Sequence, residues 1–224
     1  MWLSNSSIGR KVVMSVTGVA LILFLTFHMA MNMVALFSET AYDQVCEFLG
    51  ANWYALVGTM GLAALFVIHI IYAFWLTIQN RRARGTDRYA VVSRPKQVEW
   101  ASQNMLVLGI IVILGLGLHF FNFWYNMQFA EIAGPTALLS ELGVEAHNGA
   151  ALIKYTFSQP VFVVLYIVWI VAIWFHLTHG FWSAMQTFGW SNDIWLKRWK
   201  AIGNWYTTIL MLGFLAVIVK FAFM

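Results

Sequence analysis

Five long apolar stretches dominate this chain of 224 residues, of which 61% are hydrophobic and 10% charged. A helix that crosses the hydrocarbon core of a bilayer needs about 20 apolar residues, and each stretch reaches that length. Because lipid offers the backbone no hydrogen-bond partners, we expect every stretch to be helical. The chain is therefore predicted to be an all-α integral membrane bundle, with residues 1–224 in one domain. The predicted spanning helices are residues 12–37, 53–78, 100–124, 161–185 and 202–224.

The basic residues predict how this bundle is oriented. Eleven of the 13 Lys and Arg residues precede the first stretch or lie in the loops after the second and fourth stretches. The opposite loops carry Lys154 and six acidic residues, and Lys220 lies near the end of the last stretch. The positive-inside rule then places the N-terminus in the cytoplasm and the C-terminus outside. Since topology explains the net charge of +4, we expect no nucleic-acid partner.

The remaining segments limit other interpretations. The first stretch is longer than the apolar core of a signal peptide and no small-residue cleavage site follows it, so we expect a retained helix. In the outer loops, residues 38–52 are predicted to form a short amphipathic helix and residues 136–147 a short interfacial helix. A single cysteine, Cys46, excludes a disulfide framework, an iron–sulfur cluster within this chain and covalent haem attachment through a C-x-x-C-H motif.

Five of the six histidines fall within the apolar stretches, while His147 lies in an outer loop. An ionisable side chain inside a membrane is costly and indicates function by default. At 1.5 Å per residue, His28 and His119 lie about 26 and 29 Å from the cytoplasmic ends of their helices. His69 and His176 lie about 24 Å from the outer ends of theirs. The four residues therefore separate into an outer pair, His28 with His119, and an inner pair, His69 with His176.

Two imidazoles at each of two depths match the needs of two bis-histidine haems, because two neutral imidazoles fill both axial positions of haem iron. Zinc or copper is a weaker alternative, since two histidines share each level and neither cysteine nor carboxylate accompanies them. Small residues could make room for a macrocycle, although close helix packing alone would also explain them. These residues are Ser15, Gly18, Gly58, Gly61, Gly109, Gly115 and Gly117.

His179 follows His176 by one turn and lies closer to the cytoplasm. Four roles remain open for it. It could be an alternative ligand, a partner of a haem propionate, part of a proton path, or a structural side chain that forms a hydrogen bond.

The segments Ser15-Val-Thr-Gly18, Phe27-His28, Ile68-His69 and Phe175-His-Leu-Thr-His-Gly-Phe-Trp-Ser183 resemble the five-helix, two-haem cytochrome b subunit of succinate:quinone oxidoreductases. This family comprises succinate dehydrogenases and fumarate reductases, and the resemblance covers nearly the whole chain. It implies two haem b groups. Their axial ligands would come from the first four helices, first with third and second with fourth, with Ser15 as a haem neighbour.

The resemblance also implies partners and a substrate. A flavoprotein subunit and an iron–sulfur subunit would bind on the cytoplasmic side of a bacterial cytoplasmic membrane, and a dimer of the whole complex is compatible with it. The basic segments 81–96 and 197–200 would dock the iron–sulfur subunit, although a purely topological role explains their charges equally well. Quinone, expected to be menaquinone, would react near the outer haem, with Glu47 as the candidate proton acceptor.

One position departs from the family pattern. Some of these fumarate reductases carry a glutamate two residues before the fourth ligand, linked to a transmembrane proton path, whereas this chain has Trp174 there. A compensating proton path of that kind is therefore in doubt. Two alternatives stay open: the dihaem cytochrome subunit of a formate dehydrogenase or hydrogenase, and a transporter or assembly protein whose histidines bind a metal ion or substrate.

Overall fold

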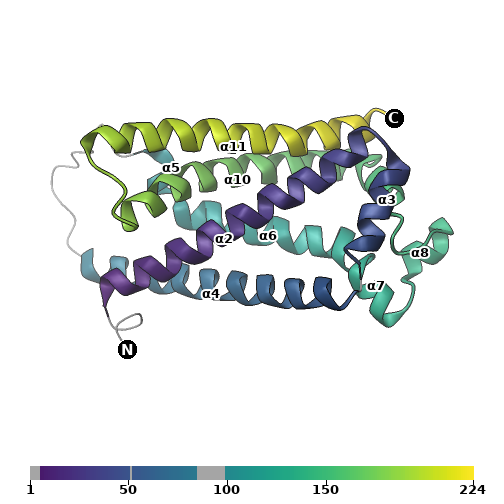
Figure 1. The fold of residues 1–224 in the computed structure, drawn as a ribbon, viewed down its shortest axis with the longest axis horizontal. Coiled ribbons are helices and arrows are strands. Elements are labelled where there is room, and N and C mark those ends of the chain that lie inside the picture. The colour runs from purple at the N-terminus through teal and green to yellow at the C-terminus, as the bar shows by residue number, and fades with distance from the viewer. Residues whose placement is uncertain (1–5, 51, 85–98) are drawn as a thin grey trace.

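The structure is a computed structural model that describes residues 6–50, 52–84 and 99–224. Its described part is helical and contains no strand, which confirms the predicted all-α fold. Five helices are long and apolar enough to span a membrane. They lie side by side along the long axis of the molecule, and α2 begins at the opposite end from the C-terminus (Figure 1). These helices are α2 (Ser7–Met33), α4 (Trp53–Arg84), α6 (Met105–His119), α10 (Pro160–Thr187) and α11 (Asp193–Ala222).

Two of the long helices begin earlier than their apolar content predicts. In α2 the side chain of Ser6 caps the first turn by accepting a hydrogen bond from the backbone N–H of Gly9 at 2.9 Å. In α11 the side chain of Asn192 accepts from Ile194 and Trp195 at 3.0 and 2.8 Å, so the helix begins at Asp193. The predicted start at residue 202 was wrong because hydropathy ignores such caps. Residues 197–200 therefore lie on a helix and not in a loop.

The third span is built from three pieces. Helix α5 (Trp100–Gln103) ends at Asn104, α6 follows, and a π-helical turn, η2 (Phe120–Trp124), completes the span. In this turn the N–H of Tyr125 donates to the carbonyl of Phe120 at 2.8 Å, which leaves one more residue per turn than an α-helix. Turns of this kind are rare and are frequent at functional sites.

Four short helices lie at the end of the bundle that the charge pattern assigns to the outside, and Figure 1 shows α3, α7 and α8 at the same end of the molecule as the C-terminus. Helices α3 (Glu39–Phe48) and α8 (Ala137–Leu142) confirm that a short helix forms in each of the two predicted segments. Helices α7 (Gln128–Ala133) and α9 (Gly149–Phe157) were missed. Both are under ten residues long, too short for a clear hydrophobic period.

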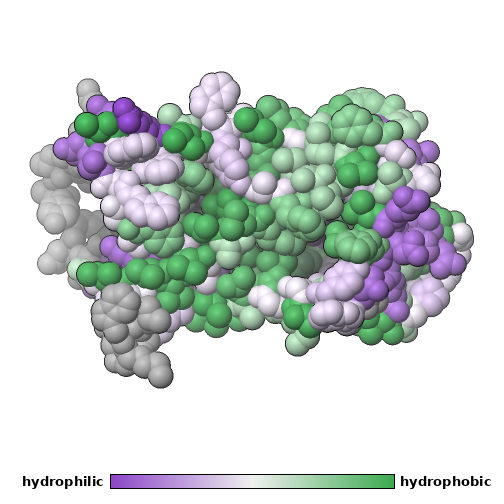
Figure 2. Space-filling model, viewed as in Figure 1, coloured by the Kyte–Doolittle hydropathy of each residue, from purple (hydrophilic) through white to green (hydrophobic). Residues whose placement is uncertain are grey.

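Helix α10 is central to the bundle, since it packs against α2, α6 and α11. Helix α4 packs chiefly on α2, and none of its described side chains is fully buried. Many large apolar side chains are exposed, as lipid contact requires. On the face in Figure 2 they form an apolar band across the middle, with hydrophilic residues toward both ends. The chain thus has the surface of a multi-pass membrane protein.

Candidate functional site

The outer histidines come from α2 and from the last residue of α6. The ring centroids of His28 and His119 lie 5.7 Å apart, with ring planes nearly perpendicular at 86°. Phe24 stacks on His28 at 5.5 Å, one turn earlier on the same helix, and Phe214 of α11 approaches it at 5.9 Å. The structure thus brings together two histidines that are 91 residues apart in the sequence.

Aromatic side chains orient His119. Its ring lies 5.2 Å from Phe123, 5.6 Å from Trp169 and 6.3 Å from Tyr166 between centroids. Trp169 reaches across α6 because Gly115 lacks a side chain, and a Cβ there would overlap the indole. The indole N–H then donates to the carbonyl of Val112 at 3.0 Å. Gly115 therefore provides room for the indole of Trp169.

The π-helical turn after His119 is fixed by a buried polar network. The side-chain amide of Asn126 donates to the carbonyls of Phe121 and Asn122 at 3.1 and 3.2 Å, while Thr136 donates to Asn126 Oδ1 at 2.6 Å. Asn122 in turn donates to the hydroxyl oxygen of Tyr166 at 3.3 Å. Because a buried network with its partners in place is rigid, this one holds the helix end that carries His119.

The inner histidines come from α4 and α10. The centroids of His69 and His176 lie 6.4 Å apart at an interplanar angle of 69°. Thr17 of α2 contacts His69, with Oγ1 3.1 Å from Nδ1. A Cβ on Gly18 would lie 3.4 Å from Cε1 of His69, and one on Gly109 would lie 3.9 Å from Cε1 of His176. Small residues thus line both inner rings.

The two pairs lie at different levels of the bundle. On α2, Thr17 touches the inner pair and His28 belongs to the outer pair, 11 residues later. At 1.5 Å per residue this spacing corresponds to about 16 Å. Eleven residues are also close to three full turns, so Thr17 and His28 lie on the same face of α2. Ser15 is buried on the same helix, one turn before Gly18.

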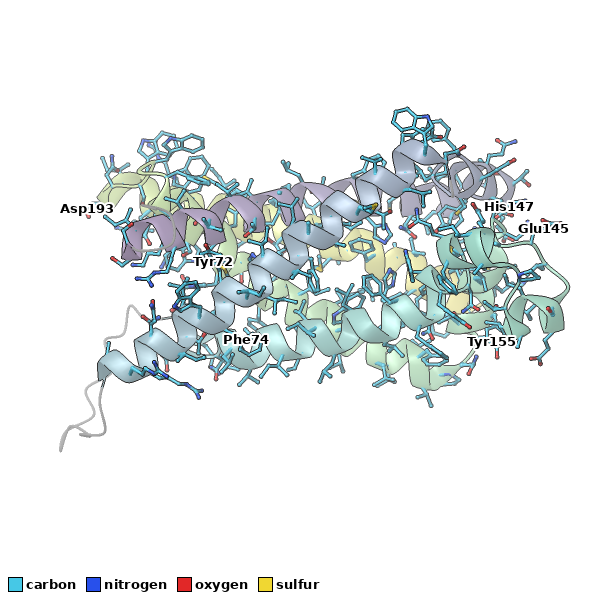
Figure 3. The ribbon with its side chains drawn as sticks, turned by 90° about the horizontal axis from the view of Figure 1, so that it is seen from below. Tyr72, Phe74, Glu145, His147, Tyr155 and Asp193 are labelled. Carbon is cyan, nitrogen blue, oxygen red and sulfur yellow. The ribbon has the colours of Figure 1, made fainter. Side chains whose placement is uncertain are left out.

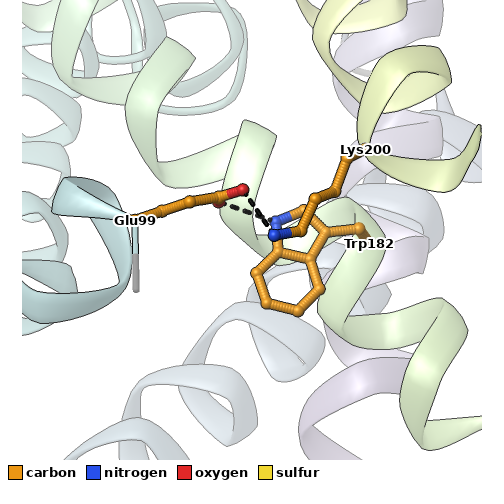
Figure 4. A network of polar contacts seen from close by, with 3 residues as sticks. All are labelled: Glu99, Trp182 and Lys200. Atoms are coloured by element: carbon orange, nitrogen blue, oxygen red, sulfur yellow. Dashed lines mark hydrogen bonds and ion pairs between the residues drawn. The ribbon is translucent and has the colours of Figure 1, made fainter. Parts of the chain in front are cut away.

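His179 lies beyond the inner pair, in a polar cluster at the end of the bundle that the charge pattern assigns to the cytoplasm. Its ring packs edge-on against Trp182 at 4.8 Å. The indole of Trp182 donates to Glu99 at 3.1 Å, and Lys200 forms an ion pair with Glu99 at 2.7 Å (Figure 4). Lys200 also lies 4.6 Å above the Trp182 ring. The cluster ties α5, α10 and α11 together, while His69 faces His176 and not His179.

A second polar chain leads from the outer pair toward the outer surface. The hydroxyl of Tyr42 on α3 donates to Asn32 Oδ1 at 3.0 Å, and Asn32 Nδ2 donates to the carbonyl of His28 at 2.8 Å. The same amide nitrogen lies 3.5 Å from His28 Nε2. Burial raises the pKa of Tyr42 well above its ordinary value, so its hydroxyl stays protonated. Glu47 lies on α3 as well and is exposed.

Trp174, where the family pattern offers a glutamate, faces α11. Its indole N–H donates to the hydroxyl of Thr208 at 2.9 Å. This side chain therefore serves as a link between α10 and α11.

A surface cleft of about 680 Å³ lies between α7 and α8 at the outer end. Glu131, Glu145 and His147, the sixth histidine, contribute to its lining. Figure 3 shows Glu145 and His147 at this end of the molecule and Asp193 at the other. The cleft is thus a feature of the outer surface, separate from the histidine pairs between the spanning helices.

The structure describes only the first residues of the basic segment 81–96. Arg81 and Arg82 are exposed on the last turn of α4, whereas residues 85–98 lie outside the described part of the chain. The docking of the iron–sulfur subunit by this segment therefore stays a prediction.

The donor set of each pair fits a bis-imidazole haem. Two imidazoles on opposite sides of one metal ion, at about 2 Å each, have ring centroids about 6.3 Å apart. The observed separations are 5.7 and 6.4 Å. Within the described residues, the buried Nδ1 atoms of His119 and His176 have no hydrogen-bond partner. The ring separation in each pair is therefore close to that expected for two imidazoles on one iron ion.

Sequence reasoning missed Asn32 as a neighbour of His28 and Thr17 as a partner of His69. Asn32 could have been found, since residues four apart on a helix share a face. Thr17 belongs to the segment Ser15-Val-Thr-Gly18, but its contact with His69 depends on how α2 and α4 are rotated against each other. No protein-family model matches the chain, and comparisons with curated proteins and with solved structures find no match either.

Proposed function

We propose that this chain is the dihaem cytochrome b subunit that anchors a succinate dehydrogenase or fumarate reductase complex in a bacterial cytoplasmic membrane. In this proposal it passes electrons between an iron–sulfur subunit on the cytoplasmic side and a quinone, expected to be menaquinone, near the outer pair. The observation that carries the proposal is the presence of two facing histidine pairs, at two depths, built from the first four spanning helices.

The side chains around the pairs support this role. His28 with His119 and His69 with His176 would hold the two haems, each of which supplies a one-electron carrier when bound. Aromatic rings surround the outer pair and small residues line the inner pair. Because two histidines would fill both axial positions of each haem iron, the pairs favour electron transfer over reaction with oxygen. The flavoprotein partner would interconvert succinate and fumarate.

The outer end offers groups for the protons that quinone chemistry exchanges. Glu47 is exposed on α3 and can exchange protons with the aqueous phase. Tyr42, on the same helix, is linked through Asn32 to His28. We therefore keep Glu47 as the candidate proton acceptor, with quinone on the outer side of His28.

The test is purification of the intact complex from its native membrane. We expect two b-type haems per chain in a reduced-minus-oxidised spectrum, a co-purifying flavoprotein with an iron–sulfur subunit, and electron transfer from succinate to a quinone. A complex with two haems but with a molybdenum- or nickel-containing partner would instead support the formate dehydrogenase or hydrogenase alternative. A preparation without any b-type band would exclude the haem proposal and favour a transporter or assembly role.

A further inference from the structure

We propose that Thr17 is a positioning residue that fixes the tautomer and orientation of His69 and thereby lowers the reduction potential of the inner haem. This inference rests on the proposed function. It starts from one contact, the 3.1 Å approach of Thr17 Oγ1 to His69 Nδ1 between α2 and α4.

The direction of this hydrogen bond follows from the other contacts of the hydroxyl. Thr17 Oγ1 lies 2.9 Å from the carbonyl oxygen of Val13 and 3.1 Å from that of Met14, one turn earlier in its own helix. A hydroxyl has one proton, and these carbonyls can only accept. Donation of this proton to one of the carbonyls leaves the lone pairs of Oγ1 free, and we infer that Oγ1 accepts a hydrogen bond from a protonated His69 Nδ1. The lone pair of the neutral ring is then at Nε2, available to a metal ion.

The surroundings restrict the ring to this arrangement. Thr17 is 4% exposed, which excludes bulk water as a competing partner. The adjacent Gly18 brings α2 so close that an added Cβ would lie 3.4 Å from His69 Cε1. The hydrogen bond with Thr17, the close contact with Gly18 and a backbone hydrogen bond with Met14 therefore hold the imidazole against α2.

The opposite ligand lacks this support. Within the described residues the Nδ1 atom of His176 is buried without a hydrogen-bond partner. A change at Thr17 should therefore affect one axial ligand of one haem, and leave the outer pair unaltered about 16 Å away along α2.

The chemical consequence has a definite sign. A histidine ligand that donates its second N–H to an acceptor becomes more basic, which stabilises the more highly charged, oxidised iron. Removal of the acceptor should therefore favour the reduced haem. A neutral hydroxyl is a modest acceptor, so we expect a roughly threefold shift of the equilibrium, or about 28 mV upward for a one-electron couple.

The experiment is a redox titration of the purified complex carrying Thr17→Val, which keeps the shape of the side chain and removes the hydroxyl. Thr17→Ser should restore the wild-type potential, and Thr17→Cys provides a second variant without a hydroxyl. Thr77→Val is the matched control, because Thr77 on α4 donates to its own helix at Ala73 with the same geometry, 2.8 Å. Low-temperature EPR of the oxidised haems reports ligand orientation independently of activity.

We expect Thr17→Val and Thr17→Cys to raise the inner-haem potential and shift its EPR signal, with the outer haem unchanged. Selective loss of the inner haem in both variants, restored by Thr17→Ser, would also support the proposal. Two haems with unaltered potentials and EPR signals would overturn it while leaving the proposed function intact. A wild-type complex without haem would overturn both.

Discussion

At the scale of single residues, the two histidine pairs are supported in different ways. A hydroxyl holds the inner ring of His69, whereas packed aromatic rings surround His119. Hydrogen bonds constrain ring rotation directly, while aromatic packing constrains it through shape. The two haems proposed here should therefore respond to different substitutions, and each pair can be tested alone.

The histidines themselves give the first prediction. His69→Ala or His176→Ala should remove the inner haem, and His28→Ala or His119→Ala the outer one, because each haem loses one of its two axial ligands. Haem content per chain and the potential of the remaining haem provide the measurement. His147→Ala, which alters the outer loop, should retain both haems. Retention of two haems after any of the four substitutions would refute the ligand assignment.

Gly115 gives a second prediction. In Gly115→Ala the new methyl group would displace Trp169 from α6 and so disturb the packing around His119. Overpacking of this kind costs about 1–3 kcal/mol. We expect reduced outer-haem content and a lower thermal midpoint, with the inner haem retained. Gly117→Ala is the matched control, since a Cβ there meets nothing within 4 Å in the structure. Equal effects of the two substitutions would contradict the role of Gly115.

The rise per residue of a helix predicts the depth of a residue along the bundle, but not which side chains it contacts. The fixed 1.5 Å per residue was enough to group His28 with His119 and His69 with His176. Contacts such as Thr17 with His69 depend on the rotation of one helix against another, which rise does not determine. The packing of Trp169 on Gly115 could not be predicted for the same reason, because the indole comes from a different helix.

At the scale of helices and loops, the apolar stretches located all five spans, but capping residues and interruptions set their ends. Hydropathy detects the part of a helix in lipid, whereas α11 begins nine residues earlier, at a polar cap. The π-helical turn also has no hydropathy signal. It is defined by the hydrogen bond from the N–H of Tyr125 to the carbonyl of Phe120. The side-chain amide of Asn126 donates to two further carbonyls in the same turn.

The cap of α11 can be tested by Asn192→Ala. This substitution removes the acceptor of two backbone N–H groups and should lower the free energy of unfolding by about 1 kcal/mol. The measurement is the thermal midpoint of the purified protein in detergent. Ser191→Ala, one residue earlier, should change the midpoint little. If Asn192→Ala were equally neutral, the first turns of α11 would not depend on this cap.

At the scale of the whole molecule, the five antiparallel spans place the start of α2 and the C-terminal end of α11 at opposite ends (Figure 1). The number of spans fixes that relation, but which end faces the cytoplasm is a prediction from the charges. Lys197 and Glu145 are both exposed and belong to opposite ends of the bundle.

The orientation can be measured in intact cells with single cysteines in a Cys46→Ser background. A membrane-impermeant maleimide should label Glu145→Cys from outside, and should label Lys197→Cys only after the membrane is permeabilised. The reason is that basic segments are retained in the cytoplasm. The reverse labelling pattern would invert the bundle, and would place the partner subunits and the quinone at the opposite ends from those proposed.

The spacing along α2 has an evolutionary consequence. Helix α2 carries both Thr17, which contacts His69, and His28 of the outer pair. It therefore fixes the distance between the two sites. A one-residue insertion between Thr17 and His28 would turn His28 by about 100° away from its partner. A viable length change would need whole turns added to α2, α6 and α10 together. We therefore expect the interval between the two redox centres to be inherited as a unit, even where the surrounding lipid-facing residues diverge freely.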